Sequence, residues 1–426
     1  MKTAGEEMHG LITRLYPICR SITGAGLRET LEIIRELIPI ETRHVPTGTK
    51  VFDWTVPKEW NIRDAWIKDS TGRRLIDFRK LNLHVVNYST PIRSRMRFAE
   101  LQDHLFTDPA HPEWVPYRTS YYTEGWGFCL SENKLHTFRE NEEYEVCIDS
   151  SLEDGHLTYG ELLLKGKQPE EVLVSCHVCH PSLADDNLSG IAVAVELARQ
   201  LINLPRRYSY RFLFVPGTIG SITWLARNED VVARIRHGLV LTCLGDRRPI
   251  TYKRSRRGNT EIDRAVAHVL KVSGDPYEVV DFFPYGYDER QYCSPGFNLP
   301  IGCMMRARHG EFPEYHTSAD NLQFVHPETL ADSLEKILAA IAVLEGDETY
   351  LNVKPKCEPQ LGRRGLYGAA ANQKSDSRQE LALLWALNFS DGQHSLLSIA
   401  ERANLPFAMI KEAAASLVAA GLLVLR

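Results

Sequence analysis

Short apolar runs alternate with one-sided helical patterns between residues 141 and 350. The apolar runs predict buried strands at 171–176, 210–215, 238–243 and 301–305. The patterns between and after them, with apolar side chains three and four residues apart, predict helices at 188–201, 221–227, 260–272 and 327–344. Because strands separated by helices build layered sheets, we predict an α/β fold with its active site at the carboxyl ends of the strands.

The pattern changes on both sides of this region. Residues 1–50 begin with helical spacing, and we assign them together with 141–350 to one α/β domain. Residues 51–140 hold five of the seven tryptophans and many polar turns, which predicts an inserted β-rich module with its own core. After a linker at about 351–376, residues 372–426 show three short helical patterns and an apolar tail, an order that resembles a winged-helix domain.

Composition and charge narrow the class of protein. With 426 residues, 43% hydrophobic and 25% charged, the chain has the composition of a globular protein with two or three domains. A net charge of −5 provides no basic field for nucleic acid, and region 372–426 balances five basic against five acidic side chains. We therefore favour docking of that region to its own chain or to a partner, and a homo-oligomer is a further possibility.

The sequence favours a cytoplasmic location. Its apolar runs are much shorter than the roughly 18 residues of a membrane span, so no membrane partner is expected. Residues 1–8 contain two glutamates and no apolar stretch, unlike a signal peptide. The nine cysteines form an odd, scattered set, which is typical of reduced thiols rather than of disulfides.

The sharpest chemical signal lies at residues 175–190. His177 follows a predicted strand, and Asp185 and Asp186 precede an Asn-x-Ser-Gly stretch that opens a helix. A single histidine is usually structural, but an imidazole at a strand end and a carboxylate at a nearby helix start can converge on one cation. His180 is a candidate for contact with metal or substrate, and a structural turn is the alternative.

The second signal is the stretch Glu314-Tyr-His-Thr-Ser-Ala-Asp-Asn321, which precedes the helix predicted from residue 327. Its imidazole, His316, is a second candidate ligand. Asp320 could orient an imidazole from behind, as carboxylates commonly do at metal sites. The alternative role for Asp320 is to cap a local turn.

These motifs resemble those of the zinc aminopeptidases, a family that includes glutamate carboxypeptidase and the bacterial double-zinc enzymes. The resemblance covers about 150–345 and implies a layered, mixed-sheet zinc-exopeptidase fold. In that family a strand-end His, the Asp before the Asn-x-Ser-Gly stretch and the His of the His-Thr motif bind zinc. Carried over to this chain, those ligands are His177, Asp186 and His316.

The whole chain also resembles a narrower group of aminopeptidase-like proteins. Members of this group carry a module inserted near the start of the peptidase fold and a winged helix at the end. The motifs that carry this resemblance lie at 53–60, 82–88, 158–161 and 180–182, and the first two fall within the predicted insertion.

The chain departs from the double-zinc pattern at three positions. The family has a Glu-Glu pair after the next strand, one Glu acting as general base and the other as ligand, where this chain has Val215-Pro-Gly-Thr-Ile-Gly220. Thr242 stands where a later Asp ligand is expected, and Cys179 replaces an Asp two residues after the first His. We therefore predict one metal ion rather than two, with three protein ligands and an open position. Zinc suits the His and Asp ligands, and manganese and iron are alternatives.

The general base is predicted among the nearby carboxylates. Glu314 is two residues from His316, so in an extended segment both side chains face the site. Glu289 and Glu311 are the rival candidates, and we favour Glu314 and Glu289, although a solvated surface position is the more common role for each residue. The base would guide a proton from a metal-bound water, whose pKa falls to about 7.

The favoured function is a metal-dependent, aminopeptidase-like exopeptidase acting on a peptide or small amide. The predicted substrate contacts are Arg290, Tyr287 and His180, and Arg290 suits a substrate carboxylate. A second hypothesis is an amide hydrolase or deacylase in surface polysaccharide metabolism, as the naming of the narrower group suggests. A third is a non-catalytic binding protein, since the Glu-Glu pair is missing. The basic run at 253–257 is expected to be a solvated loop.

Overall fold

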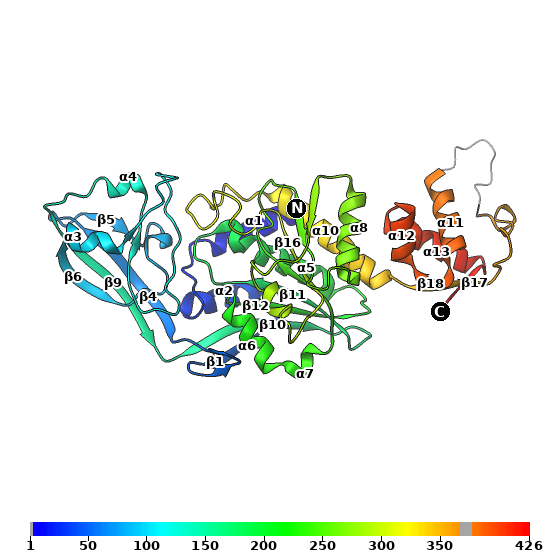
Figure 1. Ribbon diagram of the computed structural model, residues 1–426, viewed down its shortest axis with the longest axis horizontal. Helices are drawn as coiled ribbons and strands as arrows, with labels where there is room; N and C mark the ends of the chain where they lie inside the picture. Colours follow the sequence, from blue (N-terminus) through cyan, green and yellow to red (C-terminus); the bar gives the residue numbers. More distant parts are fainter. Residues whose placement is uncertain (1–2, 367–376) are drawn as a thin grey trace. The chain divides into compact units, whose positions relative to one another are not determined.

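One mixed sheet of eight strands organises the α/β part of the chain (Figure 1). The computed structural model describes residues 3–366 and 377–426. The strands follow the order β1 (Glu41–Pro46), β10 (His156–Leu164), β12 (Ser209–Val215), β11 (Glu171–His177), β13 (Ile235–Leu241), β16 (Ile301–Met305), β14 (Ile250–Lys253) and β15 (Tyr277–Val280). The central strands β12, β11, β13 and β16 are parallel to one another, and β1, β10 and β14 pair antiparallel.

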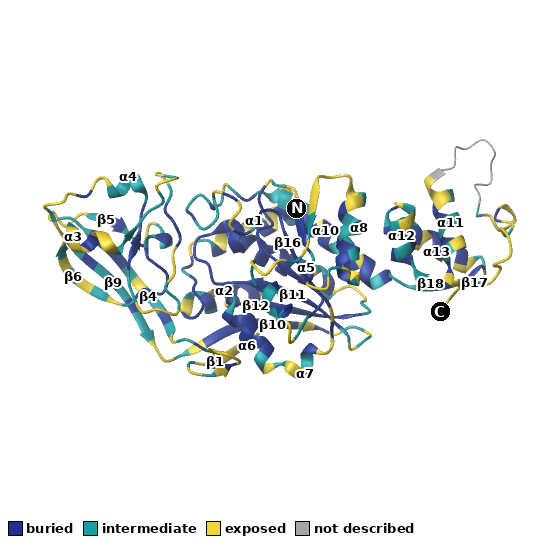
Figure 2. Ribbon diagram, viewed as in Figure 1, coloured by how far each residue is buried: buried dark blue, intermediate teal, exposed yellow. Residues whose placement is uncertain are grey.

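The central strands of this sheet have continuous apolar sequences because both of their faces are buried. Every residue of β11 and β12 is buried, as parallel strands with two covered faces require (Figure 2). Ser175 of β11 lies opposite Val240 of β13. The two strands therefore end side by side, and the residues that follow them meet at one edge of the sheet.

Helices cover this sheet, and the connection from β11 to the helix that follows it lies at the edge where β11 and β13 end. They are α1 (Ala4–Leu15), α2 (Ala25–Leu37), α5 (Gly190–Ile202), α6 (Ile219–Arg227), α7 (Glu229–Val232) and α9 (Glu289–Tyr292). α5 packs against β11 and β13, and α1 packs against α5. A π-helical turn, η3 (Ala184–Ser189), joins the end of β11 to the start of α5.

The inserted module has a sheet of its own. Its order is β5 (Arg74–Asp77), β4 (Glu59–Lys68), β9 (Glu143–Glu153) and β6 (Ile92–Arg97). Around it lie the hairpin β2 (Lys50–Val51) and β3 (Trp54–Thr55), the pair β7 (Leu105–Phe106) and β8 (Phe128–Cys129), the helices α3 (Phe98–Leu101) and α4 (Glu132–Leu135), and the 3₁₀ turns η1 (Asn82–His84) and η2 (Gln102–His104). Burial alternates along β9, so one face supplies the module's core, which includes Tyr144, Val146 and Ile148.

The described chain divides into two compact units. The first is Met1–Gly258 with Glu278–Leu334, and the second is Asn259–Tyr277 with Glu335–Arg426. The second holds α8 (Glu261–Ser273), the later part of α10 (Pro327–Gly346), β17 (Thr349–Asn352), η4 (Gly362–Arg364), α11 (Ser377–Phe389), β18 (Asp391–Ser395), α12 (Leu396–Ala403), α13 (Phe407–Ala419) and β19 (Leu423–Leu425). Inside this unit, Arg264 of α8 is ion-paired with Glu401 of α12.

The predicted layered α/β fold is confirmed, and each predicted strand and helix is found within a few residues of its expected bounds. The predicted linker at 351–376 includes the end of β17, which pairs with β18 and β19. Residues 372–376 of the predicted C-terminal domain lie outside the described residues. Among the helices described, none has the length and apolarity that crossing a bilayer requires.

Candidate metal centre

His177 and Asp186 meet at the edge where β11 ends. His177 is the last residue of β11, and Asp186 lies in the turn η3 that follows. Both side chains are fully buried, and His177 Nε2 lies 2.8 Å from Asp186 Oδ1. The strand end and the helix start thus bring an imidazole and a carboxylate together, as their positions in the sequence predict.

Two polar side chains hold this turn in place. The Asp320 carboxylate accepts hydrogen bonds from the backbone N–H groups of Asp185 and Asp186, at 2.6 and 3.0 Å. The Asn187 amide donates to the carbonyl oxygens of His177 and Leu241, at 3.3 and 3.1 Å. Because these bonds tie η3 to the ends of β11 and β13 and to the His316 loop, the Asp186 carboxylate has a fixed position.

His316 and His180 complete a ring of imidazoles around Asp186. His316 Nε2 lies 3.1 Å from Asp186 Oδ2, and His180 Nδ1 lies 3.9 Å from Asp186 Oδ1. The ligand atoms of His177, His180 and Asp186 all lie within 4.8 Å of one another. The structure therefore brings together the three predicted ligands and adds His180, which the sequence analysis proposed as a contact with metal or substrate.

The donor set fits a metal ion. Although Asp186 Oδ2 and His316 Nε2 are close, their geometry is not that of a hydrogen bond, and neither atom has a hydrogen-bond partner within the described chain. Burial lowers the pKa of His177 and takes that of His180 well below its usual value, which leaves neutral nitrogens with lone pairs. Burial acts to raise the pKa of Asp186, but the neighbouring imidazoles outweigh it and hold that pKa well below its usual value.

Tyr287 lies directly against two of these imidazoles. Its ring stacks on His177 with centroids 3.6 Å apart, and its hydroxyl lies 3.4 Å from His180 Nε2. A Cβ added to Gly217 would overlap the Tyr287 ring. The phenol therefore covers the segment in which the double-zinc pattern has its Glu-Glu pair.

The two predicted bases are both engaged in ion pairs. Glu289 is fully buried, with its Oε1 2.5 Å from Lys253 Nζ, and it also accepts from the backbone N–H of Tyr287. Its charge acts on His177 by raising the pKa of that imidazole, against the larger lowering by burial. Glu314 Oε2 instead lies 3.2 Å from Arg248 Nη2. The base role of either carboxylate stays a prediction.

Two expectations about these residues are wrong. The segment around Glu314 is not extended: the N–H of Thr317 bonds back to the Glu314 carbonyl, and His316 has a positive φ of 56°. Two residues in a turn do not share a face in the way that they do in a strand. Lys253 is not in a solvated loop but is 1% exposed, because β14 places it against Glu289.

Arg290, the third predicted substrate contact, lies in the short helix α9. Its Nε atom is buried and has no hydrogen-bond partner within the part of the chain that the structure describes. Its charge acts on the buried Asp288, lowering a pKa that burial raises to about 7. Among the described residues, no hydrogen bond or ion pair joins Arg290 to the imidazoles, so its substrate role stays a prediction.

The inserted module contributes a residue that the sequence analysis missed. The backbone N–H of Tyr117 donates to the carbonyl of His316 at 2.7 Å, and the Tyr117 ring centroid lies 5.1 Å from that of His316 and 5.2 Å from that of His180. A β-bridge between Pro116 and Thr317 fixes this approach. No motif surrounds Tyr117, so nothing in the sequence marked it.

His309 was also missed. Its Nε2 atom is buried without a hydrogen-bond partner among the described residues, and its ring stacks on Tyr287 with centroids 5.6 Å apart. Burial lowers the pKa of His309 to about 4, so the ring is neutral at physiological pH. The signal that could have found it is its place seven residues before His316, in the same loop.

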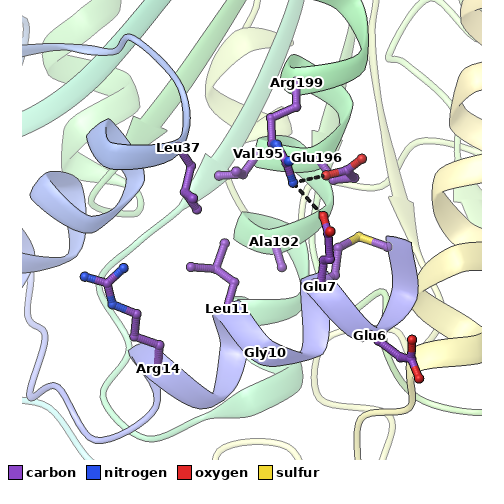
Figure 3. A pocket seen from close by; sticks show the side chains of 11 residues that line it. Glu6, Glu7, Gly10, Leu11, Arg14, Leu37, Ala192, Val195, Glu196 and Arg199 are labelled. Atoms are coloured by element: carbon purple, nitrogen blue, oxygen red, sulfur yellow. Dashed lines mark hydrogen bonds and ion pairs between the residues drawn. The ribbon is translucent and has the colours of Figure 1, made fainter. Parts of the chain in front are cut away.

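A separate hollow of about 450 Å³ lies along α1 and α5 (Figure 3). Its floor is apolar, with Leu11 and Val195, and Arg199 at its rim is paired with Glu7 and Glu196. None of the predicted ligands or substrate contacts lines it. Because both of its arginines, Arg14 and Arg199, are already paired with carboxylates, it provides no argument for a second site.

Two family models match the sequence. Residues 9–347 match a domain of unknown function, DUF4910, and residues 348–425 match a winged helix-turn-helix. The chain belongs to the DUF4910 family. The DUF4910 match spans the α/β part and the insertion together, and the winged-helix match confirms the C-terminal domain that the helical patterns predicted.

Relatives from Clostridium acetobutylicum resemble this DUF4910 protein over nearly its whole length. A "putative polysaccharide biosynthesis protein with aminopeptidase-like domain" is 52% identical over 413 residues, which is 97% of this chain and 95% of the relative. A crystal structure described as a putative peptidase from the same organism superposes with a TM-score of 0.95 at 51% identity, covering 99% of this chain and 96% of the other.

More distant structures share the fold. BSAP, a zinc aminopeptidase from Bacillus subtilis, superposes with a TM-score of 0.58 at 13% identity, covering 80% of this chain and 94% of BSAP. A peptidase M28 precursor from Shewanella amazonensis gives 0.53 at 13% identity, covering 80% and 93%. The resemblance to the zinc aminopeptidases is therefore confirmed at the level of the fold.

Proposed function

We propose that this DUF4910 protein is a metal-dependent amide hydrolase, an aminopeptidase-like exopeptidase that holds one zinc ion. His177, Asp186 and His316 are the proposed ligands, and His180 is a fourth candidate. The observation that carries the proposal is the convergence of three imidazoles on one buried carboxylate from two distant segments of the chain. Among the described residues, Asp186 Oδ2 and His316 Nε2 have no hydrogen-bond partner, which supports a cation as the group that joins them.

The ligand types support zinc, and the surroundings support one ion. Imidazole nitrogen and carboxylate oxygen are ordinary zinc ligands, and three protein ligands with an open position are typical of catalytic sites. Val215-Pro-Gly-Thr-Ile-Gly220 supplies no carboxylate, and the Tyr287 ring fills the space beside Gly217. When bound, zinc supplies Lewis acidity that polarises an amide carbonyl and activates water.

Residues of this chain hold the proposed ligands in place and form the walls of the site. Asp320 and Asn187 fix the Asp186 turn, and Tyr287 and Tyr117 form walls against the imidazoles. Glu289 places a buried negative charge near His177, balanced by Lys253. We propose Glu289, rather than Glu314, as the carboxylate that acts on the imidazoles, because the charge of Glu289 acts on His177.

The proposal is tested by measuring metal and hydrolysis on the same preparation. We expect about one zinc per chain by elemental analysis and hydrolysis of aminoacyl-4-nitroanilides. His316→Ala should remove both, whereas the control His394→Ala, an imidazole of the C-terminal unit that is paired with Asp391, should change neither. A wild-type protein that holds no stoichiometric metal when purified or when titrated with zinc would contradict the proposal.

The amide substrate could instead join an acyl group to an amino sugar, and this is the second candidate function. The name of the Clostridium acetobutylicum relative connects it with polysaccharide biosynthesis. The exposed ring of Tyr122 lies against Tyr121, whose hydroxyl is 2.6 Å from that of Tyr117 at the site. A panel of aminoacyl anilides and N-acylated amino sugars separates the two candidates by their kcat/KM values. A reducing, cytoplasmic setting is proposed for both, because none of the nine cysteines, all of which lie among the described residues, forms a disulfide.

A further inference from the structure

A small pocket on the inserted module is lined by aromatic rings. The pocket has a volume of about 240 Å³ and is lined by residues 55–58, Tyr88, residues 120–124 and Leu152. We call it the tyrosine pocket. It is smaller than the roughly 300–1,000 Å³ of sites for drug-sized ligands, so its size suits a single ring.

One ring of this pocket and one ring beside it face solvent. Tyr122 is 54% exposed and Trp54, on the neighbouring hairpin β2–β3, is 41% exposed; their ring centroids lie 5.2 Å apart. Large aromatic side chains are costly to leave in water, and when they gather beside a pocket they mark a binding surface. Behind them, the Tyr88 hydroxyl is bonded to Thr23 and to the Lys58 carbonyl, so the pocket is already ordered.

The rim of the tyrosine pocket is polar. It carries the hydroxyls of Ser120 and Thr123, and Lys58 Nζ lies 3.8 Å from Glu124 Oε1 with both side chains largely exposed. Flat apolar faces with donors and acceptors around them match a pyranose ring, which has C–H groups on its faces and hydroxyls at its edge. A peptide would favour an exposed strand edge, but β2 and β3 are only two residues long and pair with each other.

The tyrosine pocket adjoins the candidate metal centre. Tyr121, which lines the pocket, has its hydroxyl 2.6 Å from the hydroxyl of Tyr117. Tyr117 in turn lies against His316 and His180. A ligand ring in the pocket is therefore separated from the metal centre by one pair of tyrosines.

We propose that the tyrosine pocket binds a sugar ring of the substrate, so that the hydrolysed amide belongs to a saccharide-linked compound. Trp54 and Tyr122 supply the stacking faces, and Lys58 and Glu124 supply hydrogen bonds to hydroxyls. The link to hydrolysis rests on the proposed function, whereas the binding of a sugar does not.

The test measures binding without catalysis. Saturation-transfer NMR in the presence of EDTA would compare trisaccharides of N-acetylglucosamine, galactose and galacturonic acid with trialanine amide. We expect transfer to ring C–H protons of at least one trisaccharide, with binding about tenfold weaker in Trp54→Ala and in Tyr122→Ala, roughly the effect of losing one aromatic contact. Trp54→Phe should retain binding, and the control Tyr277→Ala, an exposed tyrosine outside the pocket, should match the wild type.

Each outcome decides the proposal. If no trisaccharide binds, or if binding survives in both alanine variants, the proposal is wrong, even where aminoacyl anilides are hydrolysed. Binding of trialanine amide alone that is lost in those variants would assign the pocket to a peptide. Sugar binding without metal or hydrolysis would support the pocket and contradict the proposed function instead.

Discussion

The site has two walls that differ in origin and in burial. The inner wall, His177 and Asp186, comes from the end of β11 and the turn η3 and is fully buried. The outer wall, His316 and Tyr117, joins a loop of the α/β part to the inserted module, and the His316 side chain is 32% exposed. The comparison shows that the sheet positions two of the proposed ligands, whereas the third, His316, is held against the inserted module.

Replacing the inner-wall carboxylate should have the largest effect. Asp186 is the group that all three imidazoles approach, so Asp186→Asn removes the charge while keeping the shape. We expect loss of bound zinc by elemental analysis and a fall in kcat/KM of more than about 100-fold, beyond the effect typical of outer partners. Asp391→Asn, an exposed carboxylate of the C-terminal unit, is the control. Full zinc content in Asp186→Asn would show that the inner wall does not hold the metal.

Weakening the hydrogen bonds that hold the Asp186 turn should have a smaller effect on zinc binding. Asp320→Asn keeps one acceptor oxygen for the two backbone N–H groups of Asp185 and Asp186 and loses the other. We expect zinc affinity to fall by about 10- to 100-fold, measured by competition with a chelator. An unchanged affinity would mean that the turn is held by Asn187 alone.

The sequence predicted the inner wall better than the outer one. The strand ending at His177 and the turn with Asp186 follow from an apolar run, a helical repeat and a separation of nine positions, all of which are local signals. His316 was found through a family motif. Tyr117 was not found because its contact with His316 joins residues 199 positions apart, and neither periodicity nor spacing encodes such a contact.

The carboxylates were the weakest part of the sequence analysis for the same reason. Glu314 was expected to face the site because an extended segment was assumed, but the hydrogen bond from Thr317 closes a turn there. Lys253 was expected in solvent because its neighbours in the sequence are basic, yet it lies in β14 and its partner, Glu289, lies 36 residues away. Ion pairs depend on tertiary packing, which composition does not reveal.

Removing the contact between Tyr287 and His180 should lower kcat/KM less than replacing a proposed ligand does. Tyr287→Phe keeps the ring stacked on His177 and removes the hydroxyl that lies 3.4 Å from His180 Nε2. We expect kcat/KM to fall roughly fivefold, the equivalent of about 1 kcal/mol for one hydrogen bond. Zinc content should not change. A loss of zinc in Tyr287→Phe would show that the hydroxyl orders the ligands themselves.

The smallest effect is expected at the ion pair that joins the inserted module to the α/β part. Glu59 of β4 accepts from Arg28 of α2 and from the backbone N–H of His156. Burial acts to raise the pKa of Glu59, but these bonds outweigh it and lower that pKa to about 2. Because the folded pKa is depressed, the stabilisation is present above the unfolded value of about 4.5 and is lost as the pH falls toward 2.

Urea unfolding of Glu59→Gln measures this ion pair. We expect destabilisation of about 1 kcal/mol at pH 7, limited by solvent screening of a partly exposed pair, and a smaller difference from the wild type at pH 3. If the loss of unfolding free energy in Glu59→Gln is the same at both pH values, the charge of Glu59 does not stabilise the contact between the inserted module and the α/β part.

The most direct test of the account is an anomalous-scattering map at the zinc edge from a zinc-soaked crystal. The account predicts one peak among His177, Asp186 and His316, at about 2.0–2.2 Å from each ligand atom, with Tyr287 beside it. Two peaks there would contradict the single ion, and a map without a peak at Asp186 would contradict the metal centre itself.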